Sequence, residues 1–121
     1  MSGSRILAID DEENFLTLLS RILGKEGYEV RTALTGEEAL KLLGQEPFEV
    51  ALIDIRMAPM DGLSLLDHIK RRHPCIKAIV VTAYPSSESR MLSLQKGASA
   101  YLIKPVEIND LKETIRATLS R

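Results

Sequence analysis

Five short apolar runs recur along the chain, and longer segments of mixed polarity separate them. The runs at residues 6–9, 50–53 and 78–81 are apolar at every position, which is typical of parallel strands covered on both faces. The run at 29–33 alternates apolar and polar residues, as expected for a strand at the edge of a sheet. With a further run at 101–103, the pattern predicts five strands.

The segments between the runs have the periodicity of amphipathic helices. In four of them, apolar residues three or four positions apart form one stripe on a helix surface. These stripes comprise Phe15, Leu18, Leu19 and Ile22; Ala39, Leu40 and Leu43; Leu65, Leu66 and Ile69; and Leu111, Ile115 and Leu119. The segment around Met91 and Leu94 is less regular, and we predict a helix there too.

Signals for the ends of helices agree with this division. Thr35 and Glu38 have the spacing of a capping box, and Ser86 is suited to cap the fourth helix. Three glycines stand where helices are expected to end, namely Gly27, Gly44 and Gly97.

Strand and helix thus alternate five times along the chain. Because parallel strands are joined by right-handed crossovers, such a chain folds as an α/β three-layer αβα sandwich with helices on both faces of the sheet. A length of 121 residues suits a single domain. We expect residues 1–4 to form a short polar tail and residues 5–121 to form the domain.

Composition restricts the partners of this domain. With 16 basic and 17 acidic side chains the formal net charge is -1, so no long-range field draws the domain onto nucleic acid or an anionic membrane. No apolar run approaches the roughly 18 residues of a membrane span, and the N-terminus lacks a secretory pattern. The single Cys75 has no partner for an internal disulfide. We therefore expect a cytoplasmic domain without direct contact to nucleic acid or membrane.

Charged and hydroxyl side chains follow four of the five predicted strands. They are Asp10 and Asp11, Asp54, Thr82, and Lys104 followed by Pro105. Because ligands of an open parallel sheet bind beyond the carboxyl ends of its strands, these residues are candidates for one site. Two carboxylates about 5 Å apart repel by roughly 3 kcal/mol at an effective dielectric constant near 20, so three invite a proton or a divalent cation. Oxygen ligands of this kind suit Mg²⁺.

The order of these motifs resembles that of a response-regulator receiver domain of two-component signalling, of the chemotaxis-regulator type. The motifs are Asp10-Asp11, Asp54, Met60-Asp61-Gly62, Thr82-Ala83, and Tyr101 to Lys104-Pro105. The resemblance covers nearly the whole chain from Ile6 to the last helix. It implies a flavodoxin-like fold with five helices around five strands in the order 2-1-3-4-5.

The resemblance also assigns chemical roles. It implies that Asp54 accepts a phosphoryl group from the phosphohistidine of a sensor histidine kinase or from a phosphotransfer protein. It makes Asp11 and Asp54 direct ligands of Mg²⁺, Asp10 a ligand through water, and the backbone carbonyl of Arg56 a third protein ligand. The domain would catalyse only its own phosphorylation and dephosphorylation, so it is not expected to be an enzyme with a separate substrate.

Further roles implied by the resemblance concern the response to phosphorylation. Lys104 would offset charge on the phosphoryl oxygens, and the peptide bond before Pro105 would be cis. Thr82 and Tyr101 would act as switch residues that reshape the face formed by the fourth helix, fifth strand and fifth helix. That face is also the expected surface of a homodimer formed on phosphorylation.

Two segments depart from the common pattern of the family. In the loop at 57–60, Met-Ala-Pro-Met, the proline more often follows the first methionine directly, so the carbonyl of Arg56 is expected to shift slightly. Tyr84 places a bulky ring beside the expected pocket. Together with Arg56 it occupies a position that in the family influences the lifetime of the acyl phosphate.

Each signal also has a simpler structural explanation. Asp10 and Asp11 alone would fit an acidic turn that caps a helix, and Asp61 with Gly62 fits a loop and helix start. Lys104 fits a surface turn, Thr82 a β-branched strand residue and Tyr101 a half-buried core residue. His68, His73 and Cys75 lack the spacing and the fourth ligand of a zinc site.

Three other functions remain in competition. A phosphohydrolase with an Asp nucleophile would place a second Asp two residues later, where this chain has Arg56. An FMN binder would need a phosphate-binding loop after the first strand, where the acidic residues 10–13 repel phosphate. An unphosphorylated pseudo-receiver would act only as an interaction module, and the complete acidic set argues against it.

Overall fold

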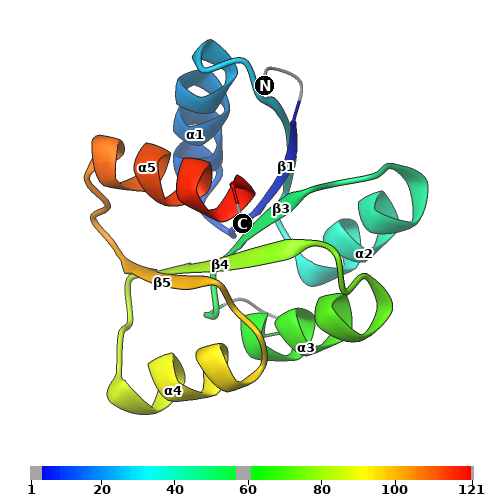
Figure 1. The fold of residues 1–121 in the computed structure, drawn as a ribbon, viewed down its shortest axis with the longest axis vertical. Coiled ribbons are helices and arrows are strands. Elements are labelled where there is room, and N and C mark those ends of the chain that lie inside the picture. Colours follow the sequence, from blue (N-terminus) through cyan, green and yellow to red (C-terminus); the bar gives the residue numbers. More distant parts are fainter. Residues whose placement is uncertain (1–3, 57–60, 121) are drawn as a thin grey trace.

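The computed structural model describes residues 4–56 and 61–120, and its centre is a sheet of five parallel strands (Figure 1). The strands are β1 (Arg5–Ile9), β2 (Glu29–Ala33), β3 (Val50–Ile53), β4 (Lys77–Thr82) and β5 (Ala100–Ile103). Their order is β2-β1-β3-β4-β5. The predicted fold class and strand order are therefore confirmed, and β2 lies at an edge as its alternating sequence predicts. Most of the predicted tail at residues 1–4 lies outside the described residues.

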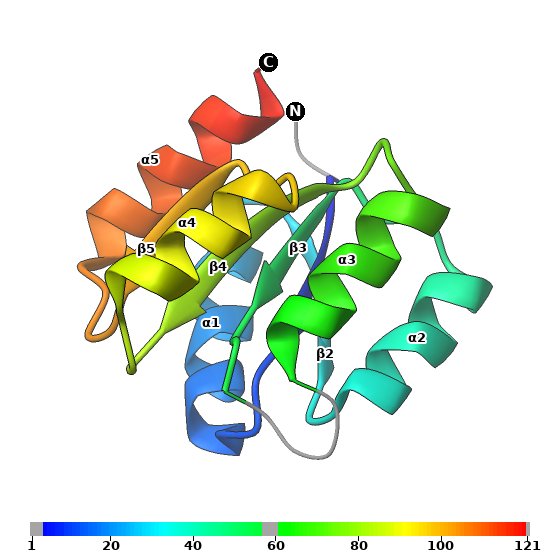
Figure 2. The same cartoon turned by 90° about the horizontal axis from the view of Figure 1, so that it is seen from below.

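Five helices cover the two faces of the sheet. They are α1 (Glu13–Lys25), α2 (Gly36–Gln45), α3 (Gly62–Arg72), α4 (Ser87–Gln95) and α5 (Ile108–Leu119). Figures 1 and 2 show α1 and α5 on one face, and α2, α3 and α4 on the other. None of the helices in the described part of the chain is long and apolar enough to cross a membrane.

The apolar runs of the sequence become strands with two buried faces. In β1, Leu7 and Ile9 pack with the residues of α2 and α3, whereas Ile6 and Ala8 pack with those of α1 and α5. Successive side chains of a strand point to opposite faces, so a strand covered on both sides is apolar at every position. The core is thus split into two layers by the sheet.

Two of the predicted caps begin helices as expected. The N–H of Glu38 donates to Thr35 Oγ1 at 3.1 Å, and the N–H of Ser89 donates to Ser86 Oγ at 2.9 Å. Both bonds satisfy backbone donors that the first turn of a helix leaves without a partner. The predicted N-caps of α2 and α4 are therefore confirmed.

The glycine signals were only partly correct. Gly27 and Gly97 follow α1 and α4 with φ angles of 93° and 103°, a left-handed conformation that glycine adopts without strain. Gly44, in contrast, lies inside α2, which continues to Gln45. The chain leaves α2 through extended Glu46, so no left-handed residue is needed at this helix end.

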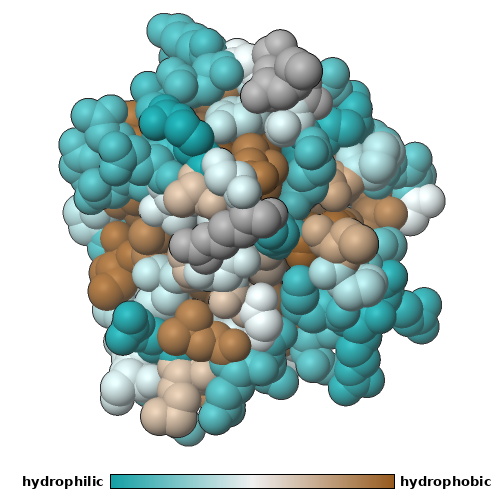
Figure 3. Space-filling model, in the orientation of Figure 1, coloured by the Kyte–Doolittle hydropathy of each residue, from teal (hydrophilic) through white to brown (hydrophobic). Residues whose placement is uncertain are grey.

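The irregular fourth helix is explained by its position beside β5. Ser93 is the buried residue of α4, while Met91 and Leu94 are 59% and 45% exposed. Ile103 at the end of β5 is 53% exposed. Apolar side chains accordingly appear on the molecular surface in the lower part of Figure 3, where Figure 1 places α4 and β5.

Candidate functional site

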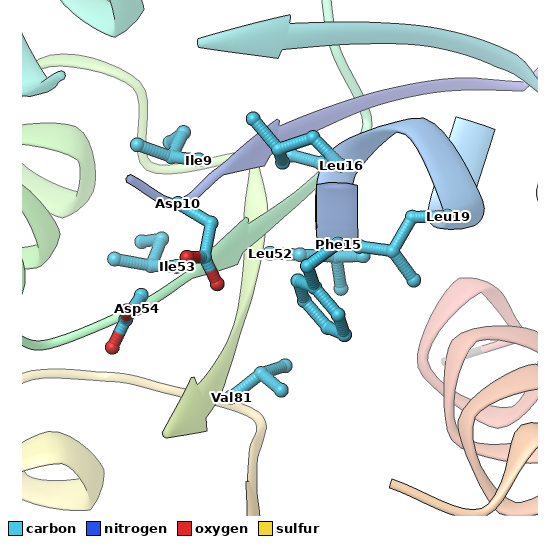
Figure 4. A pocket seen from close by; sticks show the side chains of 10 residues that line it. Ile9, Asp10, Phe15, Leu16, Leu19, Leu52, Ile53, Asp54 and Val81 are labelled. Carbon is cyan, nitrogen blue, oxygen red and sulfur yellow. The ribbon is translucent and has the colours of Figure 1, made fainter. Parts of the chain in front are cut away.

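The carboxyl ends of β1 and β3 place two acidic side chains next to each other. Asp10 follows β1 and Asp54 follows β3, and the N–H of Asp54 donates to the carbonyl of Ile9 at 3.0 Å. Figure 4 shows both carboxylates projecting beyond the strand ends. Because β1 and β3 are neighbours and parallel, their register fixes this proximity.

Gly62 allows α3 to begin directly against the backbone that follows Asp54. A Cβ atom at Gly62 would lie 2.2 Å from the carbonyl oxygen of Asp54 and 2.4 Å from Cα of Ile55. Asp61 caps the same helix, since its Oδ1 accepts the N–H of Ser64 at 2.8 Å. The interpretation of these two residues as a helix start is confirmed, and the close approach gives the glycine a second role.

Three carboxylates form a cluster with the dimensions of a cation site. Asp10, Asp11 and Asp54 each offer an oxygen, and these oxygens lie within 4.8 Å of one another. Within residues 4–56 and 61–120 this is the one group of acidic, histidine or cysteine side chains that meets this description. Asp10 and Asp54 are buried, whereas Asp11 is exposed. Hard oxygen donors with one side open to solvent fit a divalent cation that retains water ligands.

The environment of Asp54 favours its protonated form. The pKa of Asp54 is raised from 3.8 to about 6, mainly because the carboxyl group is buried and to a smaller extent because of the nearby charges of Asp10 and Asp11. A hydrogen bond from the N–H of Arg56 to Asp54 Oδ1, 3.1 Å long, and the charge of Lys104 lower the pKa and offset part of the rise. At neutral pH the carboxylate of Asp54 is thus mostly ionised, and its buried charge destabilises the folded state. A bound cation would reduce this free-energy cost.

Lys104 extends from the end of β5 into the acidic cluster. Its Nζ lies 2.6 Å from Asp10 Oδ2, 3.1 Å from Glu12 Oε1 and 3.9 Å from Asp54 Oδ2. Burial lowers the pKa of Lys104, but the hydrogen bonds to Asp10 and Glu12 raise it above its ordinary value. The ammonium is therefore charged and only 10% exposed. The peptide bond between Lys104 and Pro105 is cis.

Two contacts of Lys104, with Glu12 and with Phe15, were not predicted from the sequence. Glu12 stands at the N-cap of α1 without a side-chain capping bond, and its carboxylate binds Lys104 instead. The ring centroid of Phe15 lies 4.3 Å from Lys104 Nζ. The periodicity of the sequence places Phe15 only in the apolar stripe of the helix. The one feature that could have indicated the contact with Lys104 is that Phe15 is the first apolar residue after the acidic residues 10–13.

Thr82 and Tyr101 occupy different surroundings. Thr82 is fully buried at the end of β4, and its Oγ1 accepts the N–H of Tyr84 at 3.0 Å. Tyr101 is half-buried, and its hydroxyl lies 2.6 Å from Ser89 Oγ and accepts the N–H of Ser86 at 3.4 Å. Tyr101 therefore contacts the start of α4. Thr82 is only an acceptor in its bond with Tyr84, so this bond does not involve the proton of the Thr82 hydroxyl.

Arg56 and Tyr84 lie beside each other in the same depression as the acidic residues. The guanidinium of Arg56 is 4.5 Å from the centroid of the Tyr84 ring. Together with Asp54 and Lys104 they line an open depression of about 300 Å³. The unusual loop at 57–60 lies outside the described residues.

Comparison with known proteins agrees with this geometry. The model of the response regulator receiver domain family matches residues 6–116. The transcriptional regulatory protein ZraR of Escherichia coli is 38% identical over 115 residues, which are 95% of this chain and 26% of ZraR. The response regulator PilR of Pseudomonas aeruginosa is 36% identical over 98% of this chain and 27% of its own length. The chain thus spans about a quarter of the length of these curated relatives.

Solved structures give the same result. A CheY-like receiver domain protein from Methanospirillum hungatei has a TM-score of 0.95 and 42% identity, with 98% of this chain and 95% of that chain covered. TrrA from Thermotoga maritima, solved in complex with Mg(2+)-BeF, has a TM-score of 0.86 and 37% identity, with 95% and 98% covered. The chain therefore belongs to the response regulator receiver domain family of two-component systems.

Proposed function

We propose that this domain accepts a phosphoryl group on Asp54 in a Mg²⁺-dependent reaction, and that this modification is its signal. One observation carries the proposal. Three carboxylates offer oxygens within 4.8 Å of one another, and the ammonium of Lys104 lies 3.9 Å from Asp54. Clustered carboxylates with a perturbed pKa are more typical of functional sites than of scaffolds.

The residues at the cluster suit Mg²⁺. Asp11 and Asp54 would bind the ion directly, Asp10 through water, and the backbone carbonyl of Arg56 would complete the protein ligands. The exposure of Asp11 supports this assignment, because Mg²⁺ usually keeps several waters. The bound ion would neutralise charge on the phosphoryl oxygens as the group is transferred.

The side chains supply the remaining chemistry. A carboxylate oxygen of Asp54 attacks phosphorus, the new P–O bond forms as the P–N bond of a phosphohistidine breaks, and the electron pair returns to the imidazole nitrogen. Lys104 offsets negative charge on the phosphoryl group, and the Thr82 hydroxyl, which accepts the N–H of Tyr84, donates its proton to a phosphoryl oxygen. The donor is a sensor histidine kinase or a phosphotransfer protein, as the family implies.

The response to phosphorylation passes from Asp54 toward α4. The added charge attracts the hydroxyl of Thr82, and Tyr101 turns further inward, away from the Ser89 hydroxyl that it contacts now. The surface formed by α4, β5 and α5 then changes shape. Exposed Met91 and Leu94 make this surface suitable for a homodimer of phosphorylated chains.

As a response regulator receiver domain, the domain would act in the cytoplasm, catalyse only its own phosphorylation and dephosphorylation, and make no direct contact with membrane. Its relatives ZraR and PilR are several times longer, so contacts with DNA in such a protein would belong to a region beyond the receiver domain. The formal net charge of -1 supports this division.

Intact-mass measurement tests the proposal. After incubation with acetyl phosphate and Mg²⁺, we expect the mass of one added phosphoryl group in the wild type, and none with Asp54→Asn or with EDTA. Asp110→Asn, which changes an exposed carboxylate in the first turn of α5, should be phosphorylated like the wild type. An unmodified wild type under conditions that phosphorylate a known receiver would support the pseudo-receiver function instead.

A further inference from the structure

The ammonium of Lys104 is held from two chemically different sides. Carboxylates approach it from Asp10 at 2.6 Å and from Glu12 at 3.1 Å, and the ring centroid of Phe15 lies 4.3 Å away. In Figure 4 the Asp10 carboxylate projects between the Phe15 ring and Asp54. A cation over an aromatic face at this distance is attracted by the negative charge of the ring face.

These contacts respond differently to the chemistry of the site. Asp10 belongs to the cluster that is suited to bind Mg²⁺, and a carboxylate shared with a cation attracts an ammonium less strongly. Glu12 is 65% exposed, so solvent screens its ion pair with Lys104. The aromatic ring carries no titratable group and binds no metal. Its attraction for Lys104 therefore persists in every state of the acidic residues.

On this basis we propose that Phe15 is a positioning residue, which holds the Lys104 ammonium beside Asp54 so that it meets the incoming phosphoryl group without reorganisation. The inference rests on the proposed function of Asp54 and Lys104. An ammonium has three hydrogens to donate, and Asp10 with Glu12 uses two of them. The third hydrogen remains for the phosphoryl oxygen. The Phe15 ring holds the Lys104 side chain at the site even when the exposed Glu12 side chain moves into solvent. Preorganised charge of this kind lowers the barrier of the transfer step.

The kinetic experiment compares Phe15→Leu, which keeps an apolar side chain, with Phe15→Tyr, which keeps the aromatic face. Phosphorylation by acetyl phosphate at saturating Mg²⁺ is followed by quenched intact-mass measurement at several donor concentrations. We expect Phe15→Leu to lower the limiting rate constant about three- to tenfold, in line with the strength of a partly buried cation–π contact. The half-saturating donor concentration and the Mg²⁺ affinity should change less than about twofold, and Phe15→Tyr should restore the rate.

Phe48→Leu is the matched control. Phe48 also lies beneath a cation, with the guanidinium of Arg5 at 5.6 Å from its ring centroid, but Arg5 begins β1, at the end of that strand away from Asp10. This variant should lose stability and keep the rate. Equal losses of rate in Phe15→Leu and Phe15→Tyr would show that packing of the helix, and not the aromatic face, matters, and would overturn the inference.

A second measurement does not depend on phosphorylation. In the NMR spectrum of the metal-free protein, the side-chain methylene protons next to Lys104 Nζ should show an upfield ring-current shift in the wild type and in Phe15→Tyr. The shift should disappear in Phe15→Leu. An unchanged Lys104 resonance in Phe15→Leu would refute the contact. A wild type that shows the shift but accepts no phosphoryl group would refute the proposed function and, with it, the role assigned to Phe15.

Discussion

Removal of the charge at Asp54 should make the metal-free protein more stable at neutral pH. Asp54 is 6% exposed and lies in the cluster with Asp10 and Asp11, so its ionised form is costly in the folded state. The substitution Asp54→Asn replaces the carboxylate with a neutral amide of nearly the same shape. The amide oxygen can still accept the N–H of Arg56, which now donates to Asp54 at 3.1 Å.

The magnitude follows from the pKa. A rise from 3.8 in the unfolded chain to about 6 in the folded protein corresponds to about 3 kcal/mol between the two protonation states. A group with a raised pKa in the folded state contributes stability that is fully present below about pH 4 and is lost as pH rises through 6. We therefore expect Asp54→Asn to exceed the wild type by about 1–3 kcal/mol at pH 7.5, and by less than about 0.5 kcal/mol at pH 4.

Urea unfolding followed by circular dichroism measures this difference, since the chain has no tryptophan for a fluorescence signal. Free energies of unfolding would be compared in EDTA from pH 4 to pH 8. Asp110→Asn, at an exposed carboxylate, serves as the control and should lose no more than about 1 kcal/mol, because it removes a favourable charge from a helix N-terminus. An Asp54→Asn protein that is less stable than the wild type at pH 7.5, or a difference independent of pH, would refute the reasoning.

Two further predictions concern the scaffold. Gly62→Ala should destabilise the fold by about 2–4 kcal/mol and weaken Mg²⁺ binding, because its Cβ would lie 2.2 Å from the carbonyl oxygen of Asp54. Gly44→Ala has open space around its Cβ and should instead stabilise the protein by about 0.5–1 kcal/mol in the same urea denaturation assay. Arg5→Ala should lower the free energy of unfolding by about 1–2 kcal/mol, because it removes two ion pairs and a hydrogen bond to a backbone carbonyl. Phosphorylation should not change, since Arg5 lies at the end of β1 away from Asp10. A loss of stability no larger than that of Arg71→Ala, at a side chain 77% exposed, would contradict the reasoning.

The sequence by itself determined the elements and their layers. Apolar residues at every position of a short run mean burial on both faces, and this pattern is local, so β1, β3 and β4 could be read directly. The alternation of strands and helices then led to a parallel sheet, and the acidic residues at the ends of β1 and β3 to a shared site. The strand order came from the family resemblance, because local periodicity contains no information on which strands are neighbours.

The tertiary structure alone decided which side chains meet at that site. Lys104 and Asp10 are 94 positions apart, and Lys104 and Glu12 are 92 positions apart, so their contacts depend on strand order and on the packing of α1 against the sheet. The same holds for Phe15 beneath Lys104 and for Arg56 against Tyr84. The raised pKa of Asp54 is likewise a property of the folded surroundings. Periodicity assigns a residue to a face of its element, whereas contacts between faces exist only after the elements have packed.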